Sequence, residues 1–269
     1  MESQELQRRV DALDWYHTFD LPGGIVTPGL FNHRNVVGRV PIPASLAGKR
    51  CLDVASSDGF WAFELARRGA ASVTSVDLPD ATQQDYSGPP REGEAWRSEG
   101  SGRANQAFAL VKEATGLQVD RIDGSVYDLD KMGLGTFDFV FMGNILLHLR
   151  DPILALSQVR AVTSPSGEFL SLEAISLPQT ILRPLSPTGQ FALGDENRFW
   201  TPNLRGHRRL VEAGGFKIVA KGGPLLQRFG DFWPRFPHER PKSLHEVTYW
   251  TFTRQFGAAM GWVRATPRD

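Results

Sequence analysis

Short apolar runs alternate with amphipathic stretches through the first half of the chain. Residues 50–54 are mostly apolar, as is typical of a strand covered on both faces. Residues 60–69 then place apolar side chains at helical spacing and end on a glycine, and residues 73–76, with valine at each end, are a second predicted strand. Strand, helix and strand in this order predict a parallel βαβ unit.

The same patterns predict further elements after this unit. We expect helices at 4–16, 31–40, 102–115, 152–162 and 203–213, and strands at 117–122, 136–144, 167–173, 216–221 and 246–255. Together they indicate a Rossmann-like α/β fold. Its sheet is mostly parallel with an antiparallel last strand, and helices cover both faces.

Three segments lack a clear period and are expected to decorate the sheet. Residues 1–45 form an N-terminal cap, and 46–269 form the main domain with insertions at 178–202 and 222–245. Long irregular loops in compact domains are often functional lids. Ligands of open α/β sheets bind beyond the carboxyl ends of the strands, so the cap and the first insertion are expected to reach the ligand.

The turn after the first apolar run has the composition of a ligand pocket. Ala55, Ser56 and Ser57 are small, and Gly59 permits a tight entry into the following helix. Asp77 ends the next strand, where a carboxylate can accept hydrogen bonds from both hydroxyls of a ribose. The alternative is an ordinary strand–turn–helix with a solvated acid at position 77.

Composition limits the remaining choices. The chain has 269 residues and a formal net charge of zero, and its one cysteine, Cys51, lies in a predicted strand, which favours a core thiol in a reducing compartment. The polar start is unlike a signal peptide, and no apolar run approaches the roughly 18 residues of a membrane span. We therefore expect a cytoplasmic protein without a membrane partner.

Charge is distributed unevenly along the chain. Residues 201–269 carry 12 Lys and Arg against 5 Asp and Glu. Such an excess suits either a solvated surface or a polyanionic partner such as tRNA. The six histidines show no metal-ligand spacing, so no metal is expected.

The turn resembles motif I of the class I S-adenosylmethionine-dependent methyltransferases. Asp53-x-Ala55-x-x-x-Gly59 follows the usual Asp-x-Gly-x-x-x-Gly, with alanine at the first glycine, and residues 122–126 and 136–144 resemble the adenine-bracketing segment and motif IV. The resemblance implies S-adenosyl-L-methionine as the cofactor. The residues implied to bind it are Asp53, Ala55, Ser57, Gly59, Asp77, Leu78, Ser125, Val126 and Asn144.

Residues 15–29, 46–53 and 142–152 narrow the resemblance to the bacterial tRNA wobble-uridine methyltransferase-like group. Its members transfer a carboxymethyl group from carboxy-S-adenosylmethionine to 5-hydroxyuridine. Two lysines and a tyrosine of that group hold the extra carboxylate, and here His17, Val36 and Leu147 replace them. The resemblance therefore implies a relative that uses plain S-adenosylmethionine, with an acceptor that need not be tRNA.

Methyl transfer needs a base only when the acceptor arrives protonated. His148, just after the motif IV strand, and His17 in the cap are the candidate bases, and each is equally suited to a structural hydrogen bond. Glu173, at a strand end, is a candidate to orient the acceptor. Five aromatic residues either wall the acceptor pocket or pin loops to the core: Trp15, Tyr16, Phe31, Phe199 and Trp200.

The favoured function is methyl transfer to a small-molecule acceptor, most simply at an oxygen. The alternatives are a tRNA wobble-uridine methyl- or carboxymethyltransferase and a non-catalytic S-adenosylmethionine-binding protein.

Overall fold

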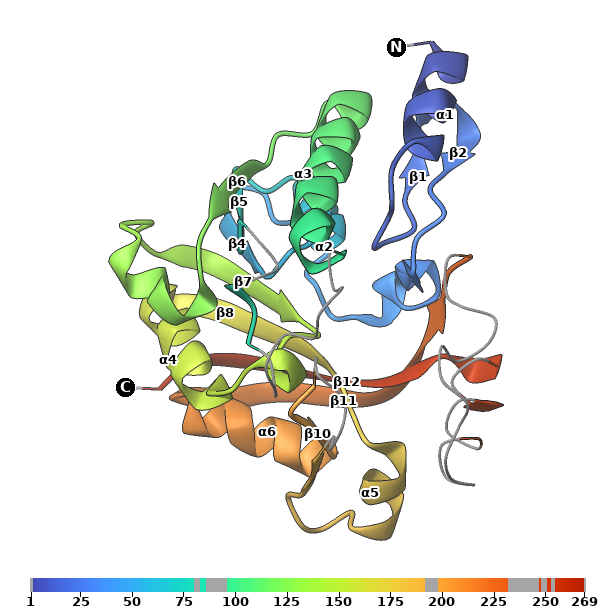
Figure 1. Cartoon of the computed structure of the whole chain (residues 1–269). Helices are drawn as coiled ribbons and strands as arrows, with labels where there is room; N and C mark the ends of the chain where they lie inside the picture. Colours follow the sequence, from blue (N-terminus) through green and yellow to red (C-terminus); the bar gives the residue numbers. More distant parts are fainter. Residues whose placement is uncertain are drawn as a thin grey trace.

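The computed structural model describes residues 2–79, 83–85, 96–191, 198–231, 247, 251–252 and 255–268, with the backbone alone for 96–103. Its main sheet has the strand order β3-β11-β12-β8-β7-β4-β5-β6 (Figure 1). The parallel strands are β4 (Arg50–Val54), β5 (Ser72–Asp77), β6 (Asp120–Asp123), β7 (Phe137–Gly143) and β8 (Thr163–Ala174).

Antiparallel strands complete one side of the sheet. The last strand, β12 (Ala258–Pro267), runs antiparallel to both β8 and β11 (Phe216–Phe229), and β3 (Phe31–Asn32) pairs with the end of β11. The predicted fold, a mostly parallel Rossmann-like sheet with an antiparallel last strand, is confirmed.

Helices cover both faces of the sheet, which explains the nearly continuous apolar strands. Cys51 and Phe139 pack on one face with α2 (Phe60–Arg67), α3 (Trp96–Thr115) and α1 (Ser3–Asp11). Leu52 and Val140 point to the other face, where α4 (Pro152–Val162) and α6 (Leu204–Ala213) lie. Cys51 is fully buried, as expected of a core thiol.

The N-terminal cap packs into the same core as α2. Trp15 and Phe19 are buried, and the Phe19 ring lies 5.5 Å from that of Phe60. The cap contains β1 (Asp20–Leu21), η1 (Pro22–Gly24) and β2 (Ile25–Val26). The predicted helix at 31–40 is wrong: β3 is followed by two 3-10 turns, η2 (His33–Asn35) and η3 (Val37–Arg39). Pairing with β11 holds this segment extended where a helix would begin.

The C-terminal prediction also needs correction. Among residues 246–255, those that the structure describes are helical, and the final strand is 258–267 instead. Aromatic and β-branched residues at 247–253 favour a strand locally. However, residues 258–267 form the strand instead, since they pair with β8 on one side and β11 on the other. The predicted loop at 222–245 begins as part of β11, and its residues 232–245 lie outside the described ranges.

The insertion at 178–202 contains regular structure that its sequence did not indicate. It holds most of α5 (Leu177–Leu182) and the strand pair β9 (Gly189–Phe191) and β10 (Trp200–Pro202), while 192–197 lie outside the described ranges. Asn203 ties the two ends of this insertion together. Its amide nitrogen donates to the carbonyls of Arg183 and Ser186, and its Oδ1 caps α6 at Gly206.

Other boundaries move by a few residues. The first helix ends at Asp11, the strand predicted at 117–122 is Asp120–Asp123, and the helix at 152–162 has the predicted bounds.

Candidate functional site

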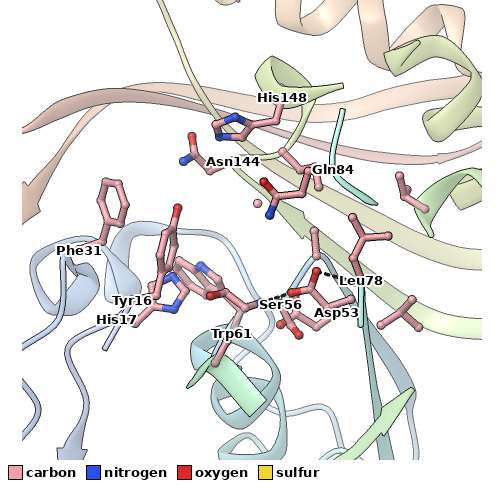
Figure 2. Close-up of a pocket in the computed structure, with 18 of the residues that line it drawn as sticks. Tyr16, His17, Phe31, Asp53, Ser56, Trp61, Leu78, Gln84, Asn144 and His148 are labelled. Carbon is pink, nitrogen blue, oxygen red and sulfur yellow. Dashed lines mark hydrogen bonds between the residues drawn. The ribbon is translucent and has the colours of Figure 1, made fainter. Parts of the chain in front are cut away.

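A cavity of about 930 Å³ lies beyond the carboxyl ends of β4, β5 and β7, between the sheet and the cap (Figure 2). Its volume is near the upper end of the range for small-molecule and cofactor sites. Of the residues proposed from sequence, the cavity wall includes Asp53, Ala55, Ser57, Asp77, Leu78, Ser125, Val126, Asn144, His17, His148, Trp15, Tyr16 and Phe31. Gly59, Glu173, Phe199 and Trp200 are not part of that wall.

The turn after β4 is built from left-handed backbone. Ala55 has φ 58° and Ser57 has φ 52°, a region that costs a residue with a side chain about 1–2 kcal/mol. The Ala55 amide donates to the Val76 carbonyl at 2.8 Å, and the Ser56 and Ser75 hydroxyls lie 2.5 Å apart. These bonds hold the strained turn against β5 and expose its backbone to the cavity.

Gly59 lies outside the cavity wall and allows the turn to enter α2. It has φ 88°, and a β-carbon placed on it would lie 2.5 Å from the ring of Phe108. Glycine is therefore required by backbone conformation and by helix packing, while contact with a ligand is not needed to explain it.

Two carboxylates face the cavity from neighbouring strands. Asp77 accepts hydrogen bonds from the amides of Ser57 at 2.5 Å and Leu78 at 2.8 Å, and Arg121 lies 3.9 Å away. Asp53 is 1% exposed, and its Oδ2 has no partner among the described residues. Burial raises the pKa of both carboxyls. An unpartnered buried oxygen calls for a donor, and a bound ligand can supply it.

The far side of this region is closed by a short polar network. Ser125 and Val126 line the cavity at the end of β6. The next residue, Tyr127, donates its hydroxyl to Asp85 at 2.5 Å, and the Arg150 amide donates to the same carboxylate at 2.8 Å. The segment 83–85 is thereby fixed over this part of the cavity.

His17 is held by Asp58, an acid that was not predicted from the sequence. Asp58 Oδ2 accepts the amides of Tyr16 at 2.9 Å and His17 at 2.7 Å, and Oδ1 is bonded to His17 Nδ1. With a carboxylate as partner, Nδ1 carries the proton and Nε2 is left as the basic nitrogen. The ring of His33 lies 4.8 Å from that of His17, and burial lowers the pKa of His33 well below its usual range, which keeps it neutral.

Tyr16 and Asn144 meet across the cavity (Figure 2). Both side chains line the cavity, and burial raises the pKa of Tyr16, so its hydroxyl stays protonated. Asn144 adopts φ 56°, and its amide donates to the Leu172 carbonyl at 2.7 Å, while its Oδ1 has no partner among the described residues. His148 lies on the opposite side of the cavity from Tyr16 and His17 (Figure 2).

Three predicted residues support the turn after β7 from behind. Glu173 accepts the amides of Ile145 at 3.1 Å and Leu146 at 3.2 Å, and burial raises its pKa to about 8. The Trp200 indole donates to the Leu146 carbonyl at 2.9 Å, and the Phe199 amide donates to the Leu147 carbonyl at 2.9 Å. These contacts hold the turn after β7, through the Trp200 ring, the Phe199 backbone and the Glu173 carboxyl.

Several cavity residues were missed by the sequence reading. The lining residues are His33, Trp61, Arg121, Gln227 and Met260. Asp58 was also missed; it lies outside the cavity wall and holds the cap from within the turn. A carboxylate inside the small-residue turn was a usable signal for Asp58. Gln227 and Met260 carry no local signal, because they reach the site only through the pairing of β11 with β12.

Within the described ranges, no group of three or more His, Cys, Asp and Glu side chains is arranged to hold a metal ion. No described helix is long and apolar enough to cross a membrane.

Two curated relatives share sequence with the chain. It is 26% identical over 179 residues to the tRNA U34 carboxymethyltransferase of Alcanivorax borkumensis, which covers 66% of this chain and 48% of that protein. It is 25% identical over 176 residues to the protein of the same name from Dichelobacter nodosus, covering 65% and 47%. The resemblance to the wobble-uridine group is confirmed, and the chain spans about half the length of these relatives. No protein-family model matches the chain.

Solved structures support the fold. The [4+2]-cyclase SpnF matches 82% of this chain and 75% of its own at a TM-score of 0.50 and 15% identity. The 1,6-didemethyltoxoflavin-N1-methyltransferase of Burkholderia thailandensis, crystallised with S-adenosylhomocysteine, matches 83% and 72% at a TM-score of 0.49 and 17% identity. The chain thus shares a Rossmann-like fold with SpnF, and the activity has to be argued from the site.

Proposed function

We propose that the protein is an S-adenosylmethionine-dependent methyltransferase that acts on a small-molecule acceptor, at an oxygen. The observation that carries the proposal is the pair of carboxylates beside the strained turn between β4 and α2, the buried Asp53 and the partly buried Asp77. We expect Asp77 to accept ribose hydroxyls. We expect the Asp53 carboxyl, which lines the cavity and has an unpartnered buried oxygen, to lie beside the amino-acid part of the cofactor.

The remaining cofactor contacts follow from the cavity wall. Left-handed Ala55 and Ser57 open the turn to close approach, and Leu78, Ser125 and Val126 provide an edge for the adenine. The cofactor supplies an electrophilic methyl group on a sulfonium. The chain contributes orientation, since displacement requires the acceptor atom to be held in line with that group.

His17 is the favoured base. Asp58 holds its Nδ1, which leaves Nε2 free to take a proton from an acceptor hydroxyl. Tyr16, next to it in the chain, is suited to hold the acceptor oxygen, and Asn144 lies beside His148 on the opposite side of the cavity. His148 is the second candidate base, from the opposite wall of the cavity. A histidine base is the reason for preferring an oxygen acceptor.

Plain S-adenosylmethionine is the proposed donor because the described residues on the acceptor side include no lysine or arginine. Val36 is 1% exposed in the apolar core, Leu147 is 4% exposed, and His17 is already paired with an acid. Among the described residues that line the cavity, Arg121 is the only Lys or Arg, and it lies beside Asp77. An extra carboxylate would be buried without compensation.

Calorimetric titration tests the proposal. We expect S-adenosylmethionine to bind the purified protein more tightly than its carboxy form, and Asp77→Ala to weaken binding by about 10-fold or more, the worth of one charge-assisted hydrogen bond. Asp120→Ala, an exposed acid at the opposite end of the neighbouring strand, is the matched control. Absence of binding would overturn the proposal, and a preference for the carboxy form would make tRNA the leading substrate.

The tRNA alternative has its own structural support. A hollow between α6 and β11 is lined by basic residues, namely Arg205, Arg208, Arg209 and Lys221, with Glu212 as the acid among them. Burial and the nearby Arg205 lower the pKa of Arg208, as expected where cations crowd together. If tRNA is the substrate, its binding should weaken steeply with salt, and Arg208→Ala should reduce that salt dependence.

The non-catalytic alternative predicts a different result. Such a protein would bind S-adenosylmethionine normally and release no S-adenosylhomocysteine with any acceptor. A solved structure of this fold that is named a cyclase shows that the fold alone does not decide between the alternatives.

A further inference from the structure

The cavity extends well beyond the carboxylates, across the edge of the sheet. Asp77 ends β5, whereas Leu172, Met260 and Gln227 come from β8, β12 and β11. Five strand spacings separate β5 from β11, which is roughly 24 Å at about 4.8 Å per strand. We call the distal part, lined by His33, Trp61, Leu172, Gln227 and Met260, the acceptor end.

Gln227 and His33 face this end as neighbours. Arg228 pairs with Asn32 and Phe229 with Phe31, so the same antiparallel register places Gln227 across from His33. The Asn35 side chain fixes the arrangement, because it donates to the Leu226 carbonyl at 2.7 Å and accepts the Arg228 amide at 3.3 Å.

Both residues are buried and incompletely bonded. Gln227 is 2% exposed and His33 is 4% exposed. Gln227 Oε1 and His33 Nδ1 have no hydrogen-bond partner among the described residues. Buried polar atoms in native proteins are almost always paired, so unpartnered atoms in side chains that line a cavity indicate what its ligand can supply.

The rest of the acceptor end is flat and apolar. The Trp61 ring stacks on Phe141 at 4.6 Å and meets the His33 ring edge-on at 5.0 Å, which fixes its orientation. Leu172 and Met260 are 1% exposed and complete the apolar wall. Rigid aromatic and aliphatic walls of this kind suit a planar ring.

Charge narrows the ligand further. The polar groups of described residues near this end include the amides of Gln227 and Asn144 and the hydroxyl of Tyr16. They also include the neutral imidazole of His33 and the ring of His17, which is bonded to Asp58. No lysine or arginine among the described lining residues lies here, and the carboxylate of Asp58 behind His17 is already satisfied by three hydrogen bonds. A ligand with a net charge would therefore be buried without a counter-charge.

We propose that the acceptor end selects an uncharged planar ring with an amide-like edge, one hydrogen-bond donor beside one acceptor, which pairs with the side chain of Gln227. As the identity of the methyl acceptor, this rests on the proposed methyl transfer. As a binding preference, it stands on the cavity alone.

Three probes of one shape test the preference: benzamide, benzoate and benzamidine, which are uncharged, anionic and cationic at pH 7.5. Their dissociation constants are measured by ligand-observed NMR on the full chain, with and without saturating S-adenosylhomocysteine. We expect benzamide to bind at least about 10-fold more tightly than either charged probe, from one net hydrogen bond and the cost of burying a charge.

Variants locate the effect at Gln227. Gln227→Leu should remove the preference for benzamide, and Gln227→Glu should transfer it to benzamidine. Gln118→Leu, at an exposed glutamine outside the cavity wall, should leave it unchanged. Thermal unfolding checks that each variant folds, and the comparison of the three probes on the wild-type chain remains decisive if Gln227→Leu does not.

Equal or tighter binding of benzoate or benzamidine to the wild-type chain overturns the inference, and so does failure of all three probes to bind at 10 mM. S-adenosylhomocysteine titrated into the same samples separates the two proposals. If it binds without probe selectivity, only the acceptor inference fails. If selectivity is found without cofactor binding, only the methyl-transfer proposal fails.

Discussion

Asp58 holds His17 at two points, accepting its backbone amide at 2.7 Å on Oδ2 and bonding its imidazole Nδ1 through Oδ1. The acid belongs to the turn before α2, and the histidine belongs to the cap. A single buried carboxylate therefore sets both the position of the cap and the tautomer of the imidazole.

Exchanging that carboxylate for an amide should reverse the tautomer. In Asp58→Asn, Oδ1 can keep the backbone bonds while the amide nitrogen donates to Nδ1, which moves the imidazole proton to Nε2. We expect ¹⁵N NMR of the His17 ring to report the change, and methyl transfer to an identified acceptor to fall by about 100-fold or more, within the usual contribution of a general base.

The control is Asp20→Asn, a cap acid that pairs with Arg34 at the surface. It should change neither the tautomer nor the rate. An unchanged rate in Asp58→Asn, with the tautomer reversed, would transfer the role of base to His148.

Ala55 stands in left-handed backbone where glycine is more comfortable. Ala55→Gly should relieve about 1–2 kcal/mol of strain and cost about 0.5–1 kcal/mol in chain entropy, so the free energy of unfolding should stay level or rise by about 1 kcal/mol. Urea unfolding measures this. Ala66→Gly inside α2 should instead lose about 1 kcal/mol. Similar losses in both variants would contradict the strain argument.

Gly59 and Gly48 separate backbone strain from packing. Both have positive φ, but a β-carbon at Gly48 meets nothing within 4 Å, whereas one at Gly59 meets the Phe108 ring at 2.5 Å. Gly48→Ala should cost about 1 kcal/mol of stability and Gly59→Ala about 3 kcal/mol. Equal costs in denaturant unfolding would show that Phe108 moves aside without penalty.

Glu173 should make stability depend on pH. Burial raises its pKa to about 8 from 4.5, so the folded protein binds this proton more tightly than the unfolded chain does. The contribution to stability is complete below about pH 4.5 and is lost as pH rises toward about 8. Glu173→Gln keeps the acceptor for Ile145 and Leu146 and should flatten this slope, with a higher melting temperature than the wild type at pH 9.

Glu168→Gln, on the same strand but partly exposed beside Arg264, is the matched control for the pH series. Parallel melting curves for the wild type and Glu173→Gln between pH 5 and 9 would show that the carboxyl titrates normally.

The sequence revealed the parts of the fold that are determined locally. A βαβ unit is predicted from two strands, the mostly apolar residues 50–54 and residues 73–76 with Asp77 at the strand end. The first of these has the composition of a strand that is buried on both faces of a sheet. The helix at 152–162 has the predicted bounds, with Asp151 capping it and Pro152 in its first turn.

The acceptor end of the cavity could not be predicted from the sequence, because its residues are brought there by strands distant in sequence. Gln227 and Met260 lie on β11 and β12, where small and mixed residues pair with neighbours distant in sequence. The more strand-like residues at 247–253 drew the prediction to the wrong place, because intrinsic β-propensity is weaker than the pairing available in the sheet. His33 likewise reaches the cavity only because its segment pairs with β11.

The position of Asp58, between left-handed Ser57 and Gly59, gives the protein a means of communication between its two binding regions. One face of the turn meets the cofactor region through Ser57 and Asp77, and its next residue holds the wall that carries His17. If a ligand in one region orders this turn and so favours binding in the other region, the coupling free energy is the same in both directions. Donor and acceptor should therefore each bind more tightly in the other's presence.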